Sequence, residues 1–211
     1  MNHTLTSSRR GFLKTTGYVS LAFGIPLDAA LSQTAAVSAK PRLPGSLNTH
    51  RKLNAWLRIN ANQTVTLLVG KVELGQGILT AVTQICADEL DIDLSRVQVI
   101  SGDTALVPNE GVTAGSFSMP YCATAVQYAS AEVRAILLEL AAEKLKQPLD
   151  SLSVHDGLVS AISGEQVAYW DLVSGEALNR EATGLVKPKP THRHRYIGHS
   201  VNRVDLTPKM L

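Results

Sequence analysis

Two short segments of small and polar residues could bind an anionic ligand through their backbone. The first is Gly75-Gln76-Gly77, which lies between a strand-like run at residues 64–69 and an amphipathic stretch at 78–90. Glycines let the backbone approach a ligand closely, and free N–H groups at a helix N-terminus favour an anion. Gln76 adds a neutral amide that both donates and accepts hydrogen bonds. Taken alone, the Gly-x-Gly pattern is more often only a tight turn.

The second segment precedes a long amphipathic stretch at about residues 119–146. It runs Thr113-Ala114-Gly115-Ser116-Phe117-Ser118. Ser116 or Ser118 can cap the helix predicted there, and Pro120 suits its first turn. Both segments follow a strand and a loop and begin a helix, so they could face one anionic ligand. A simple capping loop is the alternative for the second segment.

The elements that would position these segments are strands and helices in alternation. Strands are predicted at residues 55–60, 65–69, 96–101, 152–155, 158–162, 166–168 and 192–197. Helices are predicted at 78–90 and 119–146, with a shorter helical stretch at 170–178. The pattern indicates an α+β fold, a small mixed or antiparallel sheet with two main helices on one side.

Composition is that of an ordinary globular protein of 211 residues, with 45% hydrophobic and 18% charged residues. The 20 basic and 18 acidic residues give a net charge of +2, and no basic stripe with aromatic residues supports nucleic-acid binding. Cys86 and Cys122 fall in or near predicted helices, and we expect both in the core. Two thiols cannot supply the four thiolates of an ordinary iron–sulfur cluster.

The N-terminus matches an export signal. Residues 8–14, which include Arg9 and Arg10, have the twin-arginine pattern, and a mildly apolar stretch follows at 18–31. That stretch is too short and too interrupted to span a bilayer, and residues 34–39 could hold a cleavage site. The twin-arginine route exports folded proteins, often with a cofactor, so we expect a periplasmic or cell-envelope location. A chance pair of arginines is the alternative.

Four segments together resemble the molybdopterin-binding large subunit of the xanthine dehydrogenase (molybdenum hydroxylase) family, most of all its isoquinoline 1-oxidoreductase beta-subunit type. They are residues 54–59, 72–77, 113–118 and 196–205. The segments occur in the family's order, behind the export signal that is usual for that type. The resemblance covers the chain from about residue 53 onward.

The resemblance implies hydroxylation of an N-heterocycle or an aldehyde with oxygen from water. The implied cofactor is molybdopterin, in bacteria commonly the cytosine dinucleotide form. Gln76 would hydrogen-bond an oxygen ligand of molybdenum as an outer-shell partner, and no residue here would ligate the metal. Gly75 and Gly77 would allow close backbone approach, and residues 114–118 would hold the pterin and its phosphates.

The resemblance also implies partners. These are a small 2Fe–2S subunit that carries the iron–sulfur clusters, the remainder of the large subunit and a small-molecule substrate, with a cytochrome c as a candidate electron acceptor. The family's catalytic Glu has no counterpart in this chain, and Glu73 does not match it. We therefore assign no catalytic residue and expect no turnover from this portion alone. An exported binding or assembly module without catalysis is the alternative.

The predicted division of the chain has four parts. They are a signal peptide (1–39), a mobile linker (40–52), a partial molybdopterin-binding domain (53–180), and a linker with the start of a truncated following domain (181–211).

Two further clusters of polar residues favour ordinary structural roles. The acidic run Asp88, Glu89, Asp91 and Asp93 lacks the glycine of a calcium loop and favours a solvated helix end. His192, His194 and His199 lack cysteine partners and helical spacing, which favours an exposed strand or linker over a metal site.

Overall fold

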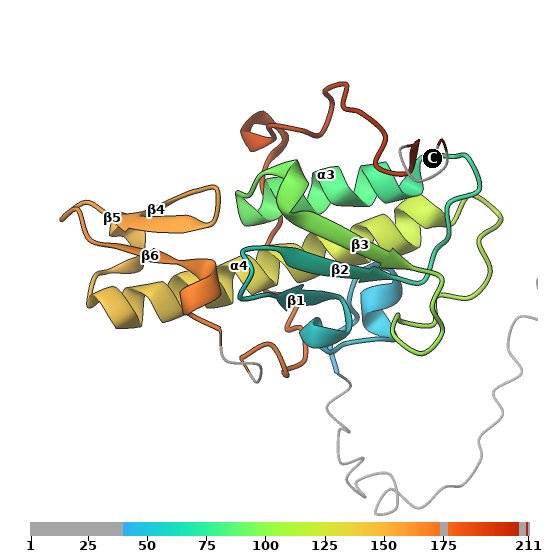
Figure 1. Cartoon of the computed structure of the whole chain (residues 1–211). Coiled ribbons are helices and arrows are strands. Elements are labelled where there is room, and N and C mark those ends of the chain that lie inside the picture. The colour runs from blue at the N-terminus through green and yellow to red at the C-terminus, as the bar shows by residue number, and fades with distance from the viewer. Residues whose placement is uncertain (1–39, 174–176, 207–209, 211) are drawn as a thin grey trace, which may run out of the picture. The chain divides into compact units, whose positions relative to one another are not determined.

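Three strands form a mixed sheet in the computed structural model, which describes residues 40–173, 177–206 and 210 (Figure 1). Strands β1 (Leu57–Ile59) and β2 (Val65–Val69) pair antiparallel across the predicted turn. Strand β3 (Val97–Ser101) pairs parallel with β2. A parallel pair needs a long crossover connection, which the helix between β2 and β3 supplies.

Two helices pack against each other on one face of this sheet (Figure 1). Helix α3 (Ile78–Leu90) follows β2, and helix α4 (Thr124–Leu145) follows the π-helical turn η4 (Ser118–Ala123). Both predicted helices are confirmed. The predicted serine cap is not formed, because η4 begins at Phe117 without a side-chain hydrogen bond.

The strands after α4 form a second sheet of their own. Strands β4 (Leu152–His155), β5 (Leu158–Ala161) and β6 (Gln166–Ala168) pair antiparallel in that order. The α+β class is confirmed, while the division into two sheets was not predicted. Arg96 joins the two sheets: its guanidinium donates twice to Asp156, at 2.8 Å each, and lies 5.2 Å from the ring centre of Trp170.

Residues 41–52, which the sequence predicts as a linker, pack into the core. Leu43 and Leu47 are 3% and 0% exposed, and the 3₁₀ helix η1 (Gly45–Asn48) holds the second of them. Gly45 has φ +55°, and a Cβ at this position would lie 2.3 Å from the carbonyl oxygen of Tyr121 in η4. The predicted linker is therefore close-packed against the start of the α4 region. It leads through the 3₁₀ helix η2 (Leu53–Ala55) to the fully buried Trp56.

The two cysteines lie in the core, as predicted. Cys86 on α3 and Cys122 in η4 are both buried free thiols. Burial raises the pKa of both, that of Cys86 to about 12, so both stay protonated at neutral pH.

The remaining described segments are short 3₁₀ turns. They are η3 (Leu94–Arg96), η5 (Leu149–Ser151), η6 (Tyr169–Asp171) and η7 (Thr191–Arg193). The predicted strand at 192–197 is wrong, because the backbone there bonds to side chains of α3 instead of to another strand. Only η6 forms in the described part of the predicted helix at 170–178.

Two further observations concern targeting. Arg9 and Arg10, predicted as part of the export signal, lie outside the described residues. Across the described residues, no helix has the length and apolar character needed to cross a membrane.

Candidate functional site

The two segments that the sequence predicts as a ligand site lie next to each other in the structure. We call residues 72–77 the glycine loop and residues 113–118 the serine loop. The glycine loop leaves the end of β2, and the serine loop completes the connection from β3 to η4 (Figure 1). The N–H of Val72 donates to Thr113 Oγ1 at 3.0 Å, which joins the first residues of the two loops.

Two residues hold the connection from β3 against the end of β2. Lys71 is 2% exposed, and its Nζ donates to the carbonyl oxygens of Glu110 and Val112, both at 2.7 Å. The carboxylate of Glu110 accepts from the N–H of Gly70 at 2.8 Å. Since Gly70 and Lys71 directly follow a strand, these contacts fix the serine loop relative to the sheet.

The N-terminus of α3 is already occupied by a carboxylate of the chain itself. Glu73 accepts from the N–H groups of Gly75 and Gly77 at 2.8 Å each, and from Leu79 at 3.3 Å. Its side chain is 5% exposed. Burial opposes its ionisation, but the three backbone hydrogen bonds outweigh burial and lower the pKa of Glu73. The sequence pattern predicts an anion at this helix end, and in the structure that anion is Glu73.

Gln76 braces the glycine loop. Its Oε1 accepts from the N–H of Leu74 at 2.6 Å, and its Nε2 donates to the carbonyl oxygen of Val72 at 3.0 Å. Both ends of the amide are therefore engaged within the loop, although the residue is exposed.

Gly75 and Gly77 are required for backbone conformation. Their φ values are +105° and +83°, which residues with a side chain rarely adopt. A Cβ at either position would have no neighbour within 4 Å. The space beside both glycines is thus open to a ligand that approaches the backbone.

The serine loop offers hydrogen-bonding groups without protein partners. Ser116 has φ +59°, uncommon for a residue other than glycine, and follows Gly115 at φ +64°. Within the described part of the chain, the hydroxyls of Ser116 and Ser118 and the N–H groups of Gly115 and Ser116 have no hydrogen-bond partner. The rings of Phe117 and Tyr121 pack edge to face, with ring centres 5.1 Å apart. Ala114 is exposed beside them.

Both loops carry exposed apolar side chains. Leu74 of the glycine loop is 70% exposed and Phe117 of the serine loop 50%. Val112, Met119 and Tyr121, which flank the serine loop, are also largely exposed. Apolar and hydrogen-bonding groups thus alternate over this part of the surface, as in sites for organic ligands.

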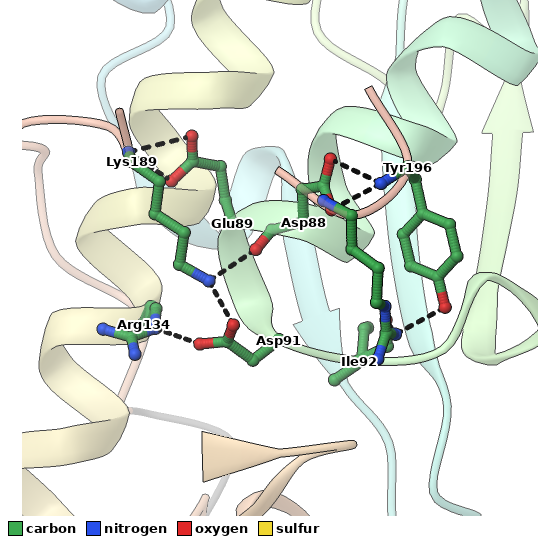
Figure 2. Close-up of polar contacts among 8 residues, drawn as sticks. Asp88, Glu89, Asp91, Ile92, Arg134, Lys189 and Tyr196 are labelled. Carbon is green, nitrogen blue, oxygen red and sulfur yellow. Dashed lines mark hydrogen bonds and ion pairs between the residues drawn. The ribbon is translucent and has the colours of Figure 1, made fainter. Parts of the chain in front are cut away.

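The acidic run at the end of α3 is buried, so the predicted solvated helix end is wrong. Figure 2 shows Asp88 and Glu89 pointing at backbone N–H groups of a C-terminal segment. Asp88 accepts from Arg195, Tyr196 and Ile197, and Glu89 accepts from Lys189. Sequence alone could not find these partners because they lie about a hundred positions away.

Charge pairing completes this cluster. Asp91 receives Arg134 Nε at 2.7 Å and the ammonium of Lys189 (Figure 2). Burial raises the pKa of Glu89 and lowers that of Lys189. No group of three or more His, Cys, Asp or Glu side chains among the described residues is arranged to hold a metal ion.

Comparison with known proteins gives a consistent family. The molybdopterin cofactor-binding domain matches residues 16–203. The large nicotinate dehydrogenase chain of Pseudomonas putida, its B subunit, is 33% identical over 75% of this chain and 13% of its own length. The beta subunit of isoquinoline 1-oxidoreductase from Brevundimonas diminuta is 33% identical over 98% of this chain and 31% of its own. The chain thus spans less than a third of either relative.

Among solved structures, CO dehydrogenase from Oligotropha carboxidovorans aligns with 55% of this chain and 15% of that chain. The identity is 25% and the TM-score 0.49.

Proposed function

Since the chain belongs to the family of molybdopterin cofactor-binding domains, we propose that its glycine and serine loops form part of a molybdopterin site. The observation that carries this proposal is the junction of the two loops at Val72 and Thr113. It brings two small-residue segments about forty positions apart in the sequence to one surface. That surface has open space at the glycines and unpartnered donors at the serines.

The residues present fit an organic, phosphate-bearing cofactor. Hydroxyl and backbone N–H groups of the serine loop are the donor types that bind phosphate and pterin oxygens. Glu73 already fills the N-terminus of α3, so we assign the cofactor's phosphate to residues 114–118 and not to the glycine loop. Gly75 and Gly77 would contribute close backbone approach to the pterin. When bound, the cofactor supplies two-electron redox chemistry.

The role implied for Gln76, an outer-shell hydrogen bond to an oxygen on molybdenum, stays a prediction. To reach such a ligand its amide must leave Leu74 and Val72. In the described conformation Gln76 stabilises the loop.

We extend the proposal to the whole protein through its relatives. The chain is homologous to part of molybdenum hydroxylase large subunits, and the proposed reaction is hydroxylation of an N-heterocycle or an aldehyde. The proposed cofactor form is the cytosine dinucleotide. Proposed partners are a small 2Fe–2S subunit, the rest of the large subunit and a cytochrome c acceptor. Arg9 and Arg10 would direct export to the periplasm.

The test is molybdenum and pterin content after purification from a molybdopterin-competent host. The chain is purified alone and after co-expression with the downstream reading frame. We expect about one molybdenum per chain with the downstream segment, and a loss of at least half in the double variant Ser116→Ala/Ser118→Ala. Ser153→Ala, an exposed serine in the second sheet, is the matched control. Absence of molybdenum and pterin in both preparations would contradict the proposal.

A further inference from the structure

The C-terminal residues 186–206, which we call the strap, follow α3 from its end back to its start. Lys189 bonds to Glu89 near the end of the helix. Gln84, in the middle of the helix, donates to the carbonyl oxygen of Tyr196 at 2.7 Å. Thr80 Oγ1, in the first turn, accepts from the N–H of Val204 at 3.2 Å. The strap thus reaches the glycine loop only at its last residues.

Arg203 is the residue of the strap that contacts the glycine loop. Its Nη1 donates to the carbonyl oxygen of Gly75 at 3.1 Å, and its Nη2 lies 3.3 Å from Glu73 Oε1. Asp205 receives Nε at 3.0 Å and Nη2 at 2.8 Å, which orients the guanidinium. Three groups therefore fix this arginine, although its side chain is 35% exposed.

Glu73 passes this contact on to the loop backbone. The same Oε1 that pairs with Arg203 accepts from Gly75 and Gly77, whose positive φ values define the loop. A cation beside a carboxylate favours the ionised form, and an ionised carboxylate is the stronger acceptor for N–H groups.

We propose that Arg203 is a positioning residue for the glycine loop. It acts through Glu73 and the carbonyl of Gly75, and holds the loop backbone in the conformation that faces the cofactor. That last element rests on the proposed function. The strap thereby makes the state of the ligand site depend on a segment nearly 130 positions further along the chain.

Hydrogen exchange in the 211-residue chain tests the contact without any cofactor. We expect Arg203→Gln to speed exchange of the Gly75 and Gly77 N–H groups about three- to tenfold, and Arg203→Lys to restore part of the protection. Arg134→Gln is the matched control, because Arg134 pairs with Asp91 at the opposite end of α3 with similar exposure. Unchanged exchange in Arg203→Gln, or an equal increase in Arg134→Gln, overturns the proposal.

Cofactor retention tests the positioning role. In the co-expressed protein, Arg203→Gln should lose pterin about three- to tenfold faster than the wild type during dialysis, whereas Arg134→Gln should not. Faster exchange with unchanged pterin loss overturns the positioning role. A wild type that holds no pterin overturns the proposed function, and the exchange experiment still decides whether Arg203 holds the loop.

Discussion

Glu73 shows how one residue can change what a local pattern means. A glycine-rich turn at a helix start offers free N–H groups, which is the usual reason to expect a bound anion there. Here the residue two positions before the first glycine supplies that anion. The phosphate-binding role therefore passes to the serine loop, where hydroxyl and N–H groups of the described chain are free of protein partners.

The lowered pKa of Glu73 predicts a pH dependence of stability. Its pKa in the folded chain lies below the ordinary 4.5, so ionised Glu73 stabilises the fold fully above about pH 4.5. This contribution is lost as the pH falls through the folded pKa. We expect Glu73→Gln to lower the free energy of unfolding by about 1 kcal/mol at pH 7.

Urea unfolding of both proteins at about pH 7 and about pH 3 measures this difference. The gap between wild type and Glu73→Gln should shrink towards zero at the lower pH. A gap that stays constant across this range would mean that the charge of Glu73 contributes nothing.

At the scale of elements, α3 is enclosed on more sides than its sequence indicates. Its apolar residues pack against α4 and the first sheet, as the periodicity predicts. Its polar end, Asp88 and Glu89, is covered by the strap and is 4% and 1% exposed. Buried carboxylates need hydrogen-bond donors, and the strap's backbone supplies them.

This arrangement predicts that Asp88 fastens the strap. Asp88→Ala would leave three buried N–H groups of residues 195–197 without an acceptor. We expect a loss of about 2–4 kcal/mol in the free energy of unfolding, and faster tryptic cleavage within the strap.

The control is Asp103→Ala, an exposed aspartate whose side chain accepts a hydrogen bond within its own turn. It should change the free energy of unfolding by no more than about 0.5 kcal/mol. Equal effects of the two substitutions in urea unfolding would contradict the fastening role of Asp88.

At the scale of the whole molecule, the core draws on segments from nearly the full described length of unit 41–211. Leu47 before the first sheet, Val126 on α4 and Leu178 after the second sheet all belong to one cluster of buried residues. The backbone of Leu53 and Asn54 bonds to Arg180 and Leu178, which ties residues before β1 to residues after β6. The segment 41–52 is thus part of the folded unit.

Leu47→Ala should therefore behave as a core truncation. We expect a loss of about 2–5 kcal/mol in the free energy of unfolding, because Leu47 is fully buried. Leu185→Ala, at a position 83% exposed, should stay within about 0.5 kcal/mol in the same urea titration. A small effect at Leu47 would restore the linker interpretation.

Sequence alone determined the elements whose signal is local. The periods of apolar residues placed α3, α4 and the strands of both sheets, and the small-residue segments marked both loops of the candidate site. These features depend on neighbours within a few positions, so a linear pattern carries them.

Only the tertiary structure decided which groups meet over long distances in the chain. The strap shows no periodicity because side chains of α3 bind its backbone, and backbone bonding leaves no pattern of residue types. Leu43 and Leu47 lie in a short segment that includes Pro44 and Gly45, too short for a period, yet both are buried. Arg203 and Glu73, 130 positions apart, could be joined only by the fold that brings the end of the strap to the start of α3.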